Sequence, residues 1–156
     1  MIKIFKNIIY IFLITFCFFR AEKVKSIIPY YYLPTIKNLQ KESLSIGKNA
    51  YQLLYFGQYD QSLNLAKLAV QINKTDEKLW LILSEAQVAN NLYENALNSL
   101  LKAQKLNAKN SEIYFAQSNI YMKISQLQKA KNALETGLRF EPNNHKAIFQ
   151  LGNILL

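Results

Sequence analysis

Cysteine and histidine are almost absent from this sequence, since Cys17 and His145 are the only residues of their kinds. A single cysteine cannot close an intrachain disulfide, and one cysteine with one histidine cannot build a zinc cluster. The four glycines are scattered and form no phosphate-binding loop. His145 opens a helix after a turn, where we expect a surface or capping role. The sequence therefore predicts no catalytic constellation, no cofactor, no metal and no small-molecule substrate, as in a non-enzyme.

Arginine is also scarce, and the net charge of +9 comes mainly from lysine. Residues 1–42 hold seven of the cations against two carboxylates, a net +5, beside a strongly apolar segment. This arrangement favours binding to an anionic membrane surface. A nucleic-acid partner would need a basic face on the folded domain, preferably rich in arginine, and we find none. We therefore predict a membrane contact and no nucleic acid.

Residues 8–19 form an apolar run that only Thr15 interrupts, with Lys3 and Lys6 before it. If the lysines snorkel, the run reaches about 18 residues, or roughly 27 Å of helix. We expect residues 1–20 to form an N-terminal hydrophobic helix that is an uncleaved anchor, because Phe19 lies where a signal peptidase prefers a small residue. A cleaved signal peptide, with the rest exported to a periplasm or thylakoid lumen, is the alternative.

The charges on the two sides of the apolar run nearly balance. The positive-inside rule then gives a slight preference for a cytoplasmic or stromal location of the rest of the chain. Residues 21–42 read as a basic linker, because Pro29 and Pro34 disfavour helix. The tyrosines at 30–32 either lie at the membrane interface or pack on the domain that follows.

Residues 77–144 read as two stacked copies of one pattern with an offset of 34 residues. Trp80 aligns with Tyr114, and Ala96 aligns with Ala130, without a gap. This period, with an aromatic residue in one helix and an alanine inside the next, resembles the tetratricopeptide repeat. The same step extends the pattern to both sides, so the resemblance covers residues 43–156.

The resemblance implies an all-α fold, a right-handed solenoid of three helix pairs plus one C-terminal helix. The expected repeats are residues 43–76, 77–110 and 111–144, with a partial fourth repeat or capping helix at 145–156. That last helix is expected to pack through Ile148, Leu151, Gly152 and Leu155. It is either a cap, part of a truncated array, or an apolar end that docks on a partner. The expected core residues are Trp80, Leu83, Ser84, Ala96, Leu100 and Ala103.

In this family the first helix of each pair lines a groove and the second forms the back. The repeat register places these residues in the groove: Tyr51, Leu54, Tyr55, Lys78, Leu81, Glu85, Val88, Phe115, Asn119, Met122, Lys123 and Phe149. The same register adds Leu44, Gly47, Ala89, Glu112, Lys146 and Asn153. Repeats that bind the C-terminal carboxylate of chaperones place Lys, Asn and Arg where this chain has Gly47, Tyr51 and Glu85, so no such clamp is expected.

Most of these groove residues are apolar or aromatic, which favours an apolar helix or extended segment of a protein partner. Alternatively, these side chains pack inside the solenoid or against the linker tyrosines. We expect a membrane-attached scaffold that assists assembly of a membrane protein complex. The layout, the composition and the run YFGQYDQSLNLAKLAVQIN are similar to repeat proteins of cyanobacteria and plastids, some of which assist photosystem I assembly. An exported adaptor of the cell envelope is the alternative.

Overall fold

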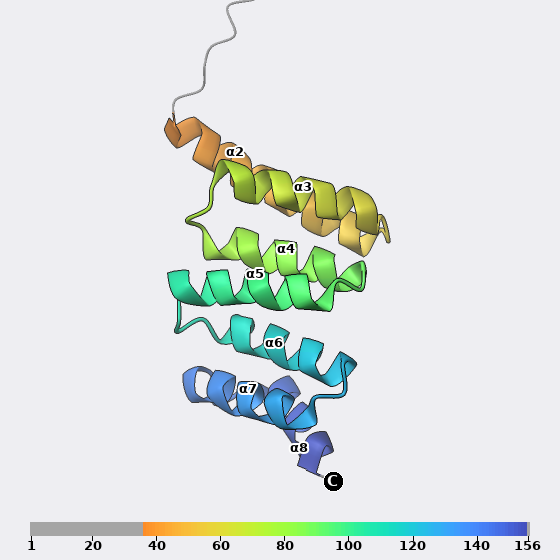
Figure 1. Cartoon of the computed structure of the whole chain (residues 1–156). Coiled ribbons are helices and arrows are strands. Elements are labelled where there is room, and N and C mark those ends of the chain that lie inside the picture. Colours follow the sequence, from red (N-terminus) through yellow and green to blue (C-terminus); the bar gives the residue numbers. More distant parts are fainter. Residues whose placement is uncertain (1–35, 156) are drawn as a thin grey trace, which may run out of the picture. The chain divides into compact units, whose positions relative to one another are not determined.

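The computed structural model describes residues 36–155, and these form seven α-helices (Figure 1). They are α2 (Ile36–Tyr55), α3 (Tyr59–Ile72), α4 (Glu77–Ala89), α5 (Tyr93–Leu106), α6 (Ser111–Lys123), α7 (Leu127–Phe140) and α8 (His145–Leu155). The expected hydrophobic helix at 1–20 and most of the expected linker lie outside the described residues. Within 36–155, no helix is both long enough and apolar enough to cross a bilayer.

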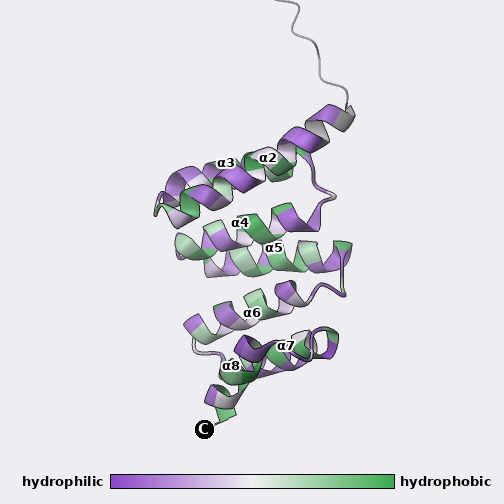
Figure 2. Ribbon diagram, turned by 180° about the vertical axis from the view of Figure 1, so that it is seen from behind, coloured by the Kyte–Doolittle hydropathy of each residue, from purple (hydrophilic) through white to green (hydrophobic). Residues whose placement is uncertain are grey.

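The helices pack in successive pairs, α2 with α3, α4 with α5 and α6 with α7, and α8 packs on α7. Figure 1 shows the pairs stacked one on the next. Each helix carries both hydrophobic and hydrophilic residues around its surface, as packing on one side requires (Figure 2). The all-α prediction, with three helix pairs and a final helix, is confirmed for the described residues.

The first helix begins earlier than expected. Residues 36–42, assigned to the linker by the sequence, form the first two turns of α2. Pro34 restricts its own backbone and that of the residue before it, but it does not prevent a helix from starting two residues later. The linker boundary at residue 42 therefore does not coincide with the start of the helix.

Three helices begin with the same capping hydrogen bond. The side chains of Asp76, Asn110 and Asn144 accept hydrogen bonds from backbone N–H groups of the helix that follows, at 2.9, 3.0 and 3.0 Å. Each satisfies a donor that the first turn of a helix leaves without an intrahelical partner. The 34-residue period of the sequence thus repeats as a period of helix starts.

The turns inside the pairs also repeat. Gly57, Asn91 and Ser125 are 34 residues apart and all have a positive φ, of 72°, 59° and 59°. This left-handed conformation ends one helix and turns the chain into its partner. Glycine, asparagine and serine differ in how readily they adopt it, so the same turn is strained to different degrees in the three pairs.

The expected core is confirmed, because Trp80, Leu83 and Ser84 are buried together with Ala96, Leu100 and Ala103. Two predictions about packing were wrong. Gly47 does not open into the groove but is buried, since a Cβ there would lie 2.6 Å from Leu79 Cδ2 and would separate α2 from α4.

The last helix also packs differently from the prediction. Ile148 and Leu155 are about half exposed, at 47 and 60 %, and Gly152 has no heavy atom within 4 Å of a built Cβ. Ala147 is the buried residue of α8 instead. Ala147 is buried like its repeat equivalents Leu79 and Ile113, so α8 keeps the repeat register. Ile148 and Leu155 are exposed because no paired second helix covers that side of α8 within the described residues.

Candidate functional site

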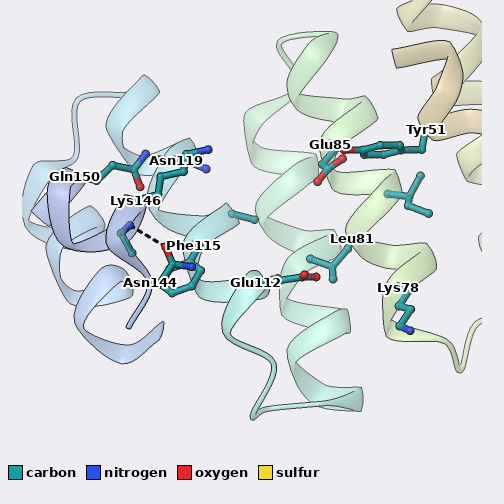
Figure 3. Close-up of a pocket in the computed structure, with 13 residues that line it drawn as sticks. Tyr51, Lys78, Leu81, Glu85, Glu112, Phe115, Asn119, Asn144, Lys146 and Gln150 are labelled. Atoms are coloured by element: carbon teal, nitrogen blue, oxygen red, sulfur yellow. Dashed lines mark hydrogen bonds between the residues drawn. The ribbon is translucent and has the colours of Figure 1, made fainter. Parts of the chain in front are cut away.

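A cavity of about 600 Å³ lies on the side of the molecule that the first helices form (Figure 3). Its walls come from α2, α4, α6 and α8 and from the turn before α8, and none comes from α3, α5 or α7. The lining residues are Tyr51, Lys78, Leu81, Ile82, Glu85, Glu112, Phe115, Ala116, Asn119, Asn144, Lys146, Ala147 and Gln150.

A second hollow of about 310 Å³ adjoins the first and shares Glu85, Ala116 and Asn119 with it. Its other lining residues are Leu54, Tyr59, Ser84, Val88, Ala89 and Ile120, so it is mostly apolar. We call the two hollows together the groove, the first being the polar hollow and the second the apolar hollow.

The repeat arranges the polar hollow in rows. One row holds Lys78, Glu112 and Lys146, each in the first turn of its helix and one repeat from the next. A second row holds Leu81 and Phe115, which are buried and half-buried. The third row holds Tyr51, Glu85 and Asn119. Charged, apolar and mixed rows therefore follow one another along the axes of the helices.

Eight of the twelve groove residues predicted first line one or both hollows: Tyr51, Leu54, Lys78, Leu81, Glu85, Val88, Phe115 and Asn119. Tyr55, Met122, Lys123 and Phe149 line neither. Tyr55 ends α2 and is 87 % exposed, and its ring meets Phe56 edge to face. Phe149 is 70 % exposed, whereas its repeat equivalent Phe115 packs on α7, a second helix of the kind that α8 lacks within the described residues.

The prediction missed one whole row of the groove. Ile82, Ala116 and Gln150 occupy equivalent places in three successive repeats and all line the polar hollow. Each directly follows a predicted groove residue, so the 34-residue register already contained this signal. The Gln150 side chain donates a 3.0 Å hydrogen bond to Asn119 Oδ1 and ties α8 to α6 at the wall.

The polar hollow is more polar than the sequence indicated, since seven of its thirteen lining residues carry a charge or an amide. Two of them are Glu85 of α4 and Glu112 of α6. Burial, and then the nearby negative charge of Glu112, raise the pKa of the Glu85 carboxyl above its usual value. Within residues 36–155, neither carboxylate forms a salt bridge or accepts a side-chain hydrogen bond.

Figure 3 shows Glu85 at the end of the Tyr51 ring and Glu112 reaching into the cavity from α6. Phe115 is fixed from behind, because its ring covers Gly137 of α7, where a Cβ would lie 2.4 Å from Phe115 Cε1. The described residues contain no group of three His, Cys, Asp or Glu that could bind a metal ion. The groove thus presents carboxylates, aromatic rings and an apolar hollow.

Residues 111–144 match the sequence profile of the tetratricopeptide repeat. No curated protein sequence matches the chain. Among solved structures, the first repeat domain of Spaghetti (RPAP3) bound to the HSP90 peptide SRMEEVD is similar, with a TM-score of 0.69 and 20 % identity. It covers 74 % of this chain and 91 % of that one.

Two further structures are similar. The OM64 domain of Arabidopsis has a TM-score of 0.69 and 16 % identity, over 74 % of this chain and 96 % of that one. The Yersinia enterocolitica type III secretion chaperone SycD, in complex with a peptide of the translocator YopD, has a TM-score of 0.65 and 15 % identity. It covers 70 % of this chain and 89 % of the other. These likenesses establish the tetratricopeptide-repeat fold.

Proposed function

We propose that this tetratricopeptide-repeat domain is a protein-interaction module that binds a segment of a partner protein in its groove. The observation that carries the proposal is that one face of four successive first helices supplies all the lining of the polar hollow except Asn144. A groove built in this way is continuous across the repeats, so it suits an elongated ligand. Its size lies within the range of ligand-binding clefts.

The side chains in the groove are suitable anchors for such a segment. Leu81 is a buried residue of the lining, Phe115 is half-buried, and Tyr51 is 54 % exposed. Aromatic side chains contribute large contact areas and are enriched among the residues that dominate binding energy. A partner's apolar side chain in the apolar hollow would lose its contact with water, which favours binding.

Two similar structures support this use of the groove. The RPAP3 domain is bound to an HSP90 peptide, and SycD is in complex with a YopD peptide. The acidic HSP90 sequence SRMEEVD is a poor model for the ligand of this chain, since Glu85 and Glu112, which line the cavity together with two lysines, would repel it. We therefore propose a peptide-binding groove of different charge preference.

The test replaces the two aromatic anchors. Tyr51→Ala with Phe115→Ala is expected to lower recovery of partners cross-linked to the full-length protein by at least tenfold. The matched control is Leu101→Ala with Leu68→Ala, two leucines that are 50 and 44 % exposed on α5 and α3. Circular dichroism checks that both variants keep their helix content. Unchanged recovery from the groove variant, or equal loss in the control, would refute binding in the groove.

We further propose that residues 1–20 attach the repeats to a membrane, with the repeats on its cytoplasmic or stromal side, and that the groove assists assembly of a membrane protein complex. The support is the apolar run with its flanking lysines. Photosystem I is one such complex, suggested by the layout of the sequence. The alternative is an exported adaptor. The N-terminus of the mature protein separates them, since a start near residue 21 or 26 would exclude the anchor.

A further inference from the structure

The polar hollow contains two carboxylates that no cation of the described residues pairs with. Glu85 and Glu112 come from different helices, line the same cavity and face no salt-bridge partner among residues 36–155. Burial, and then the negative charge of Glu112, disfavour the ionised form of Glu85. A ligand cation between the two carboxylates would offset this repulsion, so the pair favours a basic group on the ligand.

Lysines of the same cavity do not already neutralise the pair. Lys78 and Lys146 are exposed at the first turns of α4 and α8, and neither approaches a carboxylate within 4.0 Å in the described part of the chain. A nearby ammonium group would lower the pKa of the Glu85 carboxyl, but that pKa is raised. Lys78 and Lys146 therefore line the cavity without offsetting the charge of Glu85.

The aromatic neighbours narrow the choice of cation. Tyr51 and Phe115 line the same cavity as the carboxylates, and the Tyr51 ring ends beside Glu85 (Figure 3). A guanidinium group is planar, so it can stack on an aromatic ring while donating several hydrogen bonds to carboxylate oxygens. An ammonium group has no such plane, so arginine fits these four side chains better than lysine does.

Glu85 also borders the apolar hollow, where Leu54, Val88 and Ile120 supply apolar walls. A residue bound at the carboxylates is thus next to a place for a large apolar side chain. Resting on the proposed function, we infer that the groove recognises a partner segment in which a basic residue, arginine in preference to lysine, adjoins a large apolar residue. The basic group lies between Glu85 and Glu112, and the apolar group enters the apolar hollow.

The experiment selects ligands without assuming a partner. Random 12-residue peptides displayed on phage are selected on the purified full-length protein in mild detergent. We expect enrichment of arginine next to Leu, Ile, Phe or Met. An enriched peptide is then labelled with fluorescein and titrated, together with versions that carry lysine or glutamine in place of the arginine. The expected order of affinity is arginine, then lysine, then glutamine.

The variant Glu85→Gln with Glu112→Gln should bind the arginine peptide with at least tenfold lower affinity. Its affinity for the glutamine peptide should change by no more than about twofold. The control, Glu94→Gln with Glu135→Gln, makes the same change of charge on α5 and α7 and should leave both affinities unchanged. Enrichment of acidic or uncharged peptides would overturn the inference. An arginine peptide that binds the groove variant as tightly as it binds the parent protein would overturn it as well.

Two further results separate this inference from the proposed function. If Leu81→Ala abolishes peptide binding while the glutamine variant does not, the groove binds proteins but its charge preference is not as we infer. If no groove variant affects binding, both ideas fail. Sedimentation of each variant tests a third occupant, because a dimer that only the glutamine variant dissociates would assign the groove to a second copy of the chain and overturn the inference.

Discussion

Trp80 and Tyr114 make the same hydrogen bond one repeat apart. The Trp80 indole donates to the carbonyl of Lys74 at 2.9 Å, and the Tyr114 hydroxyl donates to the carbonyl of Ala108 at 2.7 Å. In both cases the acceptor lies six residues earlier, in the loop that leads into the helix. Two chemically different rings therefore hold equivalent loops against their helices, which explains why either is suitable at this place in the repeat.

The first prediction removes one of these bonds. Tyr114→Phe keeps the ring but removes the hydroxyl that donates to the Ala108 carbonyl and accepts a 3.3 Å hydrogen bond from Gln104 Nε2. We therefore expect a loss of about 1 kcal/mol in the free energy of unfolding. Urea denaturation followed by circular dichroism measures the change. Tyr121→Phe is the matched control, because Tyr121 is half-buried on the same helix and its hydroxyl makes no hydrogen bond within residues 36–155. Equal effects of the two substitutions would contradict a role for this bond.

Much of the fold could be predicted because the residues that define the repeat have strong preferences for particular places in a helix or turn. The alanines at 96 and 130, the aromatics at 80 and 114 and the helix caps recur at one fixed step. The contacts within a repeat array are mostly with the neighbouring repeat, so the register alone predicts which residues are buried. The face that lines the groove follows from the same register.

The departures have a different origin. The register gives the side of a helix that a residue occupies but not whether a neighbouring helix covers that side, so Phe149 was misplaced. It also gives no electrostatics, because the raised pKa of Glu85 depends first on its burial and then on the charge of Glu112 on another helix. Side chains at helix ends, such as Tyr55, lie beyond the hollows. These properties require the three-dimensional arrangement.

The second prediction contrasts two exposed glycines. Gly57 has φ +72°, and Gly152 lies within α8, while neither has an atom within 4 Å of a built Cβ. An added methyl group therefore meets no steric contact at either position, and the backbone conformation decides whether the substitution stabilises or destabilises the protein. Gly57→Ala should destabilise by roughly 1 kcal/mol, because an alanine is strained at positive φ. Gly152→Ala should stabilise by about 0.5 kcal/mol, because glycine costs a helix conformational entropy. Thermal and urea denaturation measure both; a shared sign would refute the explanation.

The third prediction concerns the support of the groove. An alanine at Gly137 would place its Cβ 2.4 Å from Phe115 Cε1, so the ring must move toward the groove. We expect Gly137→Ala to destabilise by about 1–3 kcal/mol, the usual cost of overpacking. Peptide affinity should fall with it, since Phe115 lines the polar hollow. Gly152→Ala is the control for an added methyl group. Unchanged affinity in Gly137→Ala would show that Phe115 does not contact the ligand.

The last prediction follows from the raised pKa of Glu85. A carboxyl whose pKa is higher in the folded than in the unfolded state binds more protons when folded, so the free energy of unfolding falls as pH rises through that interval. Its contribution is complete below the unfolded value, near 4.5, and is lost above the folded value. The free energy of unfolding of Glu85→Gln should therefore equal that of the parent protein near pH 4 and exceed it at pH 7. The difference is expected to be on the order of 0.5 kcal/mol, because the side chain is solvent-accessible.

A second substitution separates the two causes of the raised pKa of Glu85. Burial is the larger cause and the charge of Glu112 the smaller one, while Lys78 and Lys146 line the same cavity in every variant. When Glu112 is already glutamine, the gain in free energy of unfolding that Glu85→Gln shows between pH 4 and pH 7 should therefore be smaller but not zero. Glu94→Gln on α5 is the control, and it should show no comparable gain over this range. An identical gain in both backgrounds would mean that the two carboxylates do not interact across the groove, because a repulsion between them is lost when either becomes an amide.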